Sequence, residues 1–182
     1  KEIQTTQNRS IEFCLLISLP SAVGLYILSK PIVYILFERG AFLNEDTFYT
    51  ANVLSMFALG LPAYILIKVL VTFFFAREDT KTPLYVSIVS VAVNIILSLI
   101  LIQSMREMCI AFSTAISSWL NVLFLYIILT LRNNITLDSH MISRCFKTII
   151  CSIVMGIVCY YLNLMLFPHL TTNSIMINVG AL

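Results

Sequence analysis

Charged side chains are scarce in this chain, yet four of them fall within five positions of one short segment. The segment is FFFAREDTKTPLY at residues 73–85, and its charges are Arg77, Glu78, Asp79 and Lys81. Only 11 Lys and Arg and 9 Asp and Glu occur in 182 residues, so this segment holds a fifth of the charge. Paired carboxylates can act as acid and base, but adjacent acids in a turn are better explained by solvation and local charge balance. Thr82 and Pro83 predict a helix start here, because a hydroxyl can cap free amides and proline suits the first helical position.

Two stripes of polar side chains lie inside the most apolar parts of the chain. The first has three- and four-residue spacing, which places its members on one helical face: Ser87, Ser90, Asn94 and Ser98. The second follows in the next apolar segment: Thr114, Ser117, Ser118 and Asn121. Polar groups within a bilayer need partners inside the protein, so the two faces are expected to meet each other. Interhelical hydrogen bonding is the favoured interpretation, and a small polar site for a cation near Asn94 and Thr114 is the alternative.

Further residues of chemical interest lie at membrane depth. Lys68 falls within an apolar segment, where a lysine either reaches toward the interface or lines a cavity that suits an anionic substrate. Both interpretations stay open. Helix-breaking residues also occur in two adjacent apolar segments: Pro20, Gly24, Gly60 and Pro62. Helix breaks are tolerated where protein or a cavity satisfies the freed backbone, and transporters use them as bending points.

Residues for enzyme, metal or nucleic-acid chemistry are sparse by comparison. His140 and His169 have no partner at ligand spacing, and the five cysteines form no CxxC pair. Neither a nucleophile elbow nor a phosphate-binding loop occurs in the sequence. The formal net charge is only +2, without a basic run that interleaves with aromatics outside the apolar segments. The sequence therefore predicts neither an enzyme nor a nucleic-acid-binding protein.

The elements that must position these residues are membrane helices. Hydrophobic residues make up 59% of the chain and charged residues 11%, against about 25% charged in a soluble domain. Five stretches exceed the roughly 18 apolar residues of a spanning helix, at residues 11–37, 48–76, 84–102, 110–131 and 146–167, and a truncated sixth starts at 174. We therefore predict an all-α, polytopic transmembrane helical bundle that forms a single membrane unit over residues 1–182. The first residue, Lys1, and the short sixth stretch indicate a piece of a longer protein or a truncated reading frame.

Lys and Arg residues divide unequally between alternate connections. With the first residue inside, the inner set has seven members: Lys1, Arg9, Arg77, Lys81, Arg132, Arg144 and Lys147. The outer set has three: Lys30, Arg39 and Arg106. Because positively charged loops stay in the cytoplasm, the N-terminus of this segment is predicted to be cytoplasmic, together with the charged turn.

Three motifs, taken in order, resemble the MurJ/MviN family. They are LFERGAF at 36–42, ALGLPAYILIKVL at 58–70 and FFFAREDTKTP at 73–83. The family consists of bacterial lipid II flippases and is related to multidrug and polysaccharide exporters, so the resemblance implies part of the C-terminal lobe of a MurJ/MATE-like fold. The chain is similar to about helices nine to thirteen of that fold plus the start of the fourteenth. Essential arginines of the family's cavity belong to preceding helices and are not assigned here.

The resemblance also implies a function. Family members move lipid II, the lipid-linked peptidoglycan precursor, from the inner to the outer leaflet of the bacterial inner membrane by alternating access. The implied partners are lipid II or a related polyprenyl-pyrophosphate-linked sugar, membrane lipids and the missing N-terminal helices. The cytoplasmic motif would then support a hinge or gate: Arg77, Asp79, Thr80, Lys81 and Pro83. The alternatives are an exporter of another polyprenyl-linked sugar or small molecule, and a nontransporting scaffold or remnant.

Sodium is the one ion that the resemblance suggests. Some family members hold Na⁺ with an Asn and an Asp four residues apart and a Thr on the next helix. Asn94 and Thr114 match two of these ligands, but Ser98 stands where the Asp would be. A neutral hydroxyl weakens a site that depends on carboxylate charge, so only a weak cation site is expected, and no other cofactor.

Overall fold

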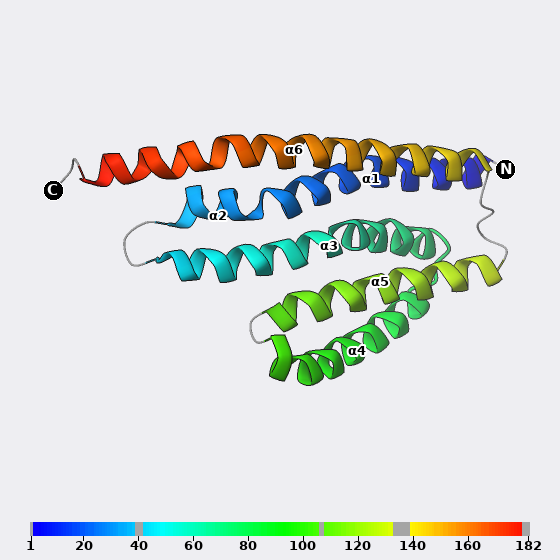
Figure 1. Cartoon of the computed structure of the whole chain (residues 1–182). Coiled ribbons are helices and arrows are strands. Elements are labelled where there is room, and N and C mark those ends of the chain that lie inside the picture. Colours follow the sequence, from blue (N-terminus) through cyan, green and yellow to red (C-terminus); the bar gives the residue numbers. More distant parts are fainter. Residues whose placement is uncertain (1, 39–41, 106–107, 133–138, 180–182) are drawn as a thin grey trace.

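The computed structural model describes residues 2–38, 42–105, 108–132 and 139–179 (Figure 1). The helices in these ranges are α1 (Glu2–Ile27), α2 (Ser29–Phe37), α3 (Asn44–Phe75), α4 (Lys81–Met105), α5 (Met108–Leu131) and α6 (Ser139–Val179). Candidate membrane spans lie at Thr6–Ile27, Asn44–Phe75, Lys81–Gln103, Met108–Leu131 and Ser143–Met165. The prediction of an all-α membrane bundle is confirmed, and five of its helices are long and apolar enough to span a membrane.

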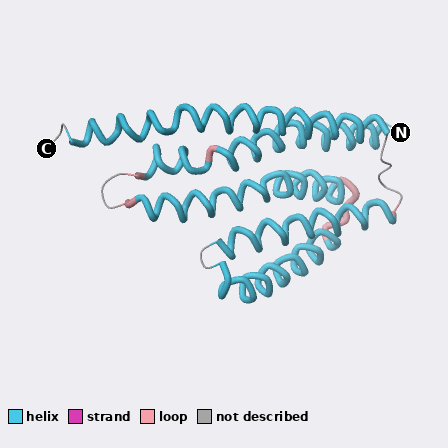
Figure 2. The backbone as a smooth tube through the Cα atoms, viewed as in Figure 1, coloured by secondary structure: helices cyan, strands magenta, loops and turns pink. Residues whose placement is uncertain are grey.

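The long helices lie side by side in the order α6, α1, α3, α5 and α4 (Figure 1). Helix α3 is central, because it packs against α1 and α2 on one side and against α5 on the other. Helix α4 packs mainly against α5, and α6 packs against α1. Most of the described turns and loops lie at the two ends of the bundle, so α3, α4 and α5 follow one another as antiparallel hairpins (Figure 2).

The first predicted span, residues 11–37, is interrupted at Leu28 and forms two helices. Pro31 explains the position of the break. A proline has no N–H to donate to the carbonyl four residues earlier, and its ring clashes with that carbonyl, here the one of Ile27. The helical hydrogen bonding resumes at the next residue, where Ile32 N–H donates to the Leu28 carbonyl at 3.0 Å. The sequence analysis did not place a break at this position.

The four residues that were predicted to break helices lie within continuous helix. Helix α1 runs through Pro20 and Gly24, and α3 runs through Gly60 and Pro62. None of them ends a helix in this structure. A bend at these positions during transport stays a prediction.

Helix α6 differs from the expected end of the chain. It is 41 residues long and runs unbroken to Val179, through the connection that was expected between residues 167 and 174. That connection followed only from the limits of the fifth and sixth predicted stretches, and it includes the polar run Thr171–Ser174. Such residues lower helix propensity by less than about 1 kcal/mol each and do not end a helix without a competing cap, so the expected loop is replaced by helix.

The buried apolar core lies toward the end of the bundle that holds the charged turn. Its members come from α1, α3, α4 and α5: Ile11, Leu66, Leu70, Phe73, Phe74, Val86, Leu125 and Leu129. Phe74 and Leu125 are each 1% exposed, which fixes the C-terminal halves of α3 and α5 against each other. The polar contacts of the charged turn are therefore built on a close-packed base.

Candidate functional site

The charged turn between α3 and α4 begins with a defined helix end. Asp79 N–H donates to the Phe74 carbonyl at 3.1 Å and Glu78 N–H donates to the Phe75 carbonyl at 3.0 Å, the two bonds of a Schellman motif. Glu78 takes the left-handed conformation, with φ 60°, at the position that glycine usually occupies. The chain therefore reverses sharply and places Asp79 directly in front of α4.

Asp79 caps the first turn of α4. Its Oδ1 accepts the Thr82 N–H at 3.1 Å, and its Oδ2 accepts the Thr82 hydroxyl at 2.7 Å. The prediction that Thr82 caps this helix and Pro83 opens it was wrong, since α4 begins at Lys81 and Pro83 is buried within its first turn. A carboxylate is a stronger acceptor than a hydroxyl and is favoured at the positive end of a helix, which explains why Asp79 takes this role.

Arg132, at the end of α5, joins the same group. Its Nη1 donates to Asp79 Oδ2 at 2.5 Å and its Nη2 donates to Thr82 Oγ1 at 3.1 Å. Hydrogen bonds from the Thr82 hydroxyl and amide, followed by the contact with Arg132, lower the pKa of Asp79 from 3.8 to about 2. We call Asp79, Thr82 and Arg132 the clamp, because they tie the α3–α4 turn to the end of α5.

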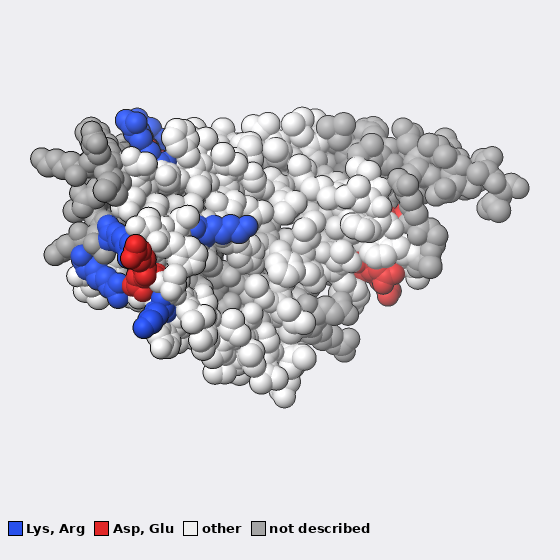
Figure 3. Space-filling model, turned by 180° about the vertical axis from the view of Figure 1, so that it is seen from behind, with Lys and Arg blue, Asp and Glu red and all other residues white. Residues whose placement is uncertain are grey.

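The remaining residues of the predicted cytoplasmic motif surround the clamp. Arg77, Thr80 and Lys81 are exposed. Figure 3 shows Lys and Arg side chains gathered mostly toward one end of the face in view, with acidic side chains among them. The turn thus combines a bonded interior with a solvated, charged rim.

A second polar group lies between α4 and α5 at membrane depth. Asn94 Nδ2 donates to Thr114 Oγ1 at 3.4 Å, and Ser98 Oγ lies 3.4 Å from Asn94 Oδ1, to which it donates. Ser98 and Ser113 hydroxyls are 2.8 Å apart. The structure therefore brings Asn94, Ser98 and Thr114 together as predicted and adds Ser113, which the sequence analysis missed. These contacts match the interpretation of the stripes as interhelical hydrogen bonding.

The same group does not fit a sodium site that relies on a carboxylate. Its oxygens are neutral and already bonded, since Thr114 Oγ1 also donates to the Ile110 carbonyl at 2.6 Å and Ser113 Oγ donates to the Cys109 carbonyl. Within the described ranges, the chain holds no cluster of three or more His, Cys, Asp or Glu residues that could bind a metal. A bound cation here stays a prediction that this geometry does not favour.

Lys68 lies on the face of α3 that turns away from the core. The side chain is exposed, whereas Leu66 and Leu70 beside it are buried. It is seven positions before the end of α3 at Phe75, within a membrane span. Its ammonium group therefore faces whatever surrounds α3 on this side, which keeps both the snorkelling and the cavity interpretations open.

The middle of α3 is packed closely around its helix-breaking residues. Gly60 and Pro62 are buried, and a Cβ on Gly60 would overlap the Tyr64 ring. Pro62 cannot donate to the Ala58 carbonyl. One residue further on, the Leu59 carbonyl accepts the indole N–H of Trp119 from α5 at 3.1 Å. Helix α5 thus supplies a donor to the backbone next to the proline.

Comparisons with known proteins identify the family of this chain. The family model described as "Lipid II flippase MurJ" matches residues 1–180. The chain belongs to the MurJ family. Among curated MurJ relatives, a probable lipid II flippase of Rhizobium tropici is 41% identical over 97% of this chain and 33% of its own length. Another, from Rickettsia prowazekii, is 37% identical over 98% of this chain and 35% of its own length.

The fold agrees with this family. A solved structure of a lipid II flippase MurJ in an inward closed conformation superposes with a TM-score of 0.72 and 25% identity, covering 92% of this chain and 40% of that one. The chain spans about a third of the length of the curated MurJ relatives that it matches. The resemblance drawn from the three motifs is confirmed, as is the match to only part of a MurJ protein.

The sequence analysis missed Arg132 as a member of the site and counted it only as a cytoplasmic cation. A signal was available, since a hairpin of α4 and α5 returns the end of α5 to the level of the α3–α4 turn. The two carboxylates in that turn, Glu78 and Asp79, were equal candidates as partners of Arg132. Choosing Asp79 requires the direction in which the Schellman motif points it, which only the structure supplies.

Proposed function

We propose that this chain supplies most of the C-terminal helical lobe of a protein that flips lipid II from the inner to the outer leaflet of the bacterial inner membrane. The observation that carries this proposal is the match of the MurJ family model over residues 1–180, together with the superposition on a solved MurJ structure. The chain acts as a transporter segment without a catalytic step, and a second lobe completes the pathway.

The membrane orientation follows from charge. The clamp end of the bundle lies in the cytoplasm, and so does the N-terminus, because Lys and Arg residues that flank the spans are concentrated there. The inside-negative membrane potential favours movement of an anionic headgroup from the inner to the outer leaflet by about 2.3 kcal/mol per charge per 100 mV. Lipid II, with its pyrophosphate, is a substrate of this charge.

Lys68 lines the cavity for that headgroup. Its side chain is exposed on the face of α3 opposite the buried Leu66 and Leu70. If Lys68 faces a second lobe, its charge offsets the cost of desolvating the pyrophosphate. For this reason we prefer the cavity-lining role of Lys68 to snorkelling. The clamp supports this wall by holding the cytoplasmic end of α3 against α5 while α3 bends near Pro62.

A flipping assay on the full-length protein tests the proposal. Liposomes carry fluorescent lipid II, and the fraction that a membrane-impermeant quencher reaches is followed with and without the protein. The protein is expected to accelerate the exchange of lipid II between leaflets. An unchanged rate would remove the lipid II proposal, and faster movement of a different polyprenyl-linked sugar would favour the alternative exporter.

Variants separate the role of Lys68 from that of the fold. Lys68→Ala is expected to slow flipping about fivefold or more, the equivalent of about 1 kcal/mol, whereas Lys68→Arg keeps most of the rate. Thr72→Ala is the matched control, because Thr72 is exposed one turn further along α3 and its hydroxyl bonds only to its own helix. Equal rates for Lys68→Ala and the control would assign Lys68 to snorkelling.

A further inference from the structure

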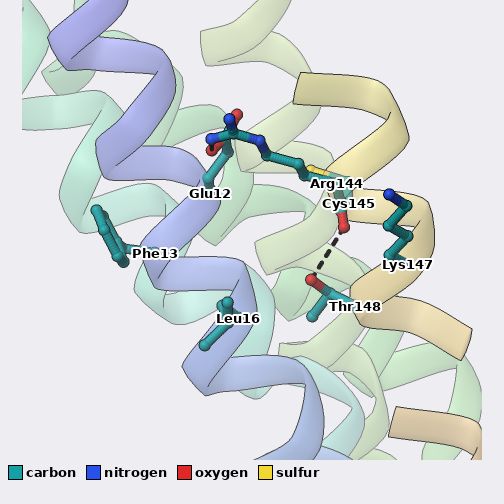
Figure 4. Close-up of a pocket in the computed structure, with 7 residues that line it drawn as sticks. All are labelled: Glu12, Phe13, Leu16, Arg144, Cys145, Lys147 and Thr148. Carbon is teal, nitrogen blue, oxygen red and sulfur yellow. Dashed lines mark hydrogen bonds and ion pairs between the residues drawn. The ribbon is translucent and has the colours of Figure 1, made fainter. Parts of the chain in front are cut away.

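A cavity of about 290 Å³ opens between α1 and α6, and its lining includes no residue of the clamp or of the α4–α5 group. Its walls combine apolar and cationic side chains from the two helices, among them Phe13, Leu16, Arg144, Lys147 and Thr148, together with Glu12 (Figure 4). In Figure 4, Glu12 and Arg144 lie toward each other across the two helices, while Phe13 and Leu16 lie further along α1. No function proposed above uses this cavity.

The cavity carries a net positive charge. Arg144 Nη1 donates to Glu12 Oε2 at 3.0 Å, and the arginine side chain is 65% exposed against 16% for the glutamate. Glu12 therefore fixes one edge of the guanidinium, and the other donors, of the five that arginine has, make no further side-chain bond within the part of the chain that the structure describes. Lys147 is exposed and forms no ion pair within the described ranges. Two cations and one anion leave one positive charge at the cavity.

The depth of the cavity matches the headgroup region of a bilayer. The membrane span of α6 is Ser143–Met165, so Arg144 and Lys147 lie in its first two turns. A hydrocarbon core about 30 Å thick takes about 20 helical residues, which places this end of a 23-residue span at the interface. Glu12, which bonds to Arg144, marks this level on α1. Phe13 and Leu16 follow it by one and four residues, so they lie within about one turn of it, and they are 65% and 54% exposed. A phosphate at the level of the cations would therefore have acyl carbons beside these two side chains.

We propose that this cavity binds the headgroup phosphate of an anionic phospholipid. Arg144 and Lys147 contact the phosphate, Glu12 positions Arg144, and Phe13 and Leu16 contact the first carbons of an acyl chain. Basic pockets between membrane helices bind anionic headgroups in this way. The apolar wall favours a lipid over free phosphate, which has nothing to place against Phe13 and Leu16. Snorkelling alone would require neither a cavity nor a carboxylate that orients the arginine.

Lipid binding to the purified full-length protein tests this site without measuring transport. The protein, in a neutral detergent, is titrated with spin-labelled phosphatidylglycerol and, separately, with spin-labelled phosphatidylcholine. Phosphatidylglycerol is expected to bind more tightly. Each basic residue near a membrane surface contributes about 1 kcal/mol, so the double variant Arg144→Gln/Lys147→Gln should lose affinity about 30-fold, and each single variant about fivefold.

Two controls distinguish a site from general charge attraction. Lys81→Gln removes an exposed cation at the start of α4 and should leave phosphatidylglycerol binding unchanged. Leu16→Trp keeps every charge but fills the cavity, and should reduce binding as the charge variants do. Equal binding of the two lipids, an equal loss in Lys81→Gln, or no loss in Leu16→Trp would overturn the proposal. Displacement by millimolar inorganic phosphate, or by lipid II in place of phosphatidylglycerol, would also overturn it.

Discussion

The contact between α1 and α6 makes a quantitative prediction at Gly156. A Cβ built on this residue would lie 2.7 Å from Val23 Cγ1 and 3.1 Å from Ile27 Cδ1. Both distances are inside the roughly 3.5–4.0 Å at which carbon atoms attract, and Val23 is β-branched, so its methyl group cannot easily turn away. Overpacking of this kind costs roughly 1–3 kcal/mol, while Gly→Ala within a helix gains roughly 0.8–1.0 kcal/mol. Gly156→Ala should therefore destabilise the α1–α6 contact by about 1 kcal/mol.

The assay is the unfolding of the full-length protein in mixed micelles by added SDS, followed by energy transfer between labels on α1 and α6. Val23→Ala removes the methyl group that the new Cβ would strike, so Gly156→Ala should be tolerated better in that background. The coupling energy between the two substitutions should be about 1 kcal/mol in the favourable direction. If Gly156→Ala were as stable as the parent, and its effect simply added to that of Val23→Ala, the close approach of the two helices would be refuted.

Three further predictions concern the turn and the α4–α5 group. Because folding lowers the pKa of Asp79 from 3.8 to about 2, the clamp contributes its full stability above about pH 4 and loses it as the pH falls toward 2. Thr82→Val should raise the midpoint of acid unfolding more than Arg132→Gln does, since the Thr82 bonds are the larger cause, and the reverse order would contradict this account. Glu78→Gly should stabilise the protein by up to about 1 kcal/mol in the same SDS titration, because glycine adopts the left-handed conformation of this position without the steric cost of a Cβ. A loss of stability would show instead that the Glu78 side chain makes a stabilising contact. The Ser98→Asp variant should have a higher melting temperature in Na⁺ than in choline, while the parent protein should melt at the same temperature in both.

Composition determined the membrane spans well, because the thickness of the bilayer leaves few solutions for a long apolar stretch. The start of α5 at Met108 and the end of α3 at Phe75 fall within two residues of the predicted limits. The polar stripe was also informative, since the Asn94 amide needs partners within the protein at this depth, and its N–H groups found one on a neighbouring helix. Thr114 meets it because the connection between α4 and α5 is short enough to force a hairpin.

Interruptions of helices and contacts between residues distant in sequence could not be predicted from composition and polar spacing. Pro20, Pro31 and Pro62 are alike in sequence, yet only the helix around Pro31 is interrupted. Burial does not distinguish them, since Pro31 and Pro62 are both buried. Pro62 differs in that the Leu59 carbonyl beside it accepts the Trp119 N–H from α5. A tertiary contact of this kind is contained in no local sequence pattern.

The polar contacts also indicate which part of this lobe can move. Helices α3, α4 and α5 are joined by the clamp at one end, by the Asn94–Thr114 group at membrane depth and by Trp119 at the centre of α3. Helix α6 is joined to α1, at Gly156 and through the Arg144–Glu12 pair, and its other faces make little contact within the described ranges. Spin labels on α3 and α5 should therefore give one narrow distance in the full-length protein, and labels on α6 and α5 a broader distribution that changes with substrate. Equal widths would mean that α6 is held by the second lobe as firmly as α5 is held by the clamp.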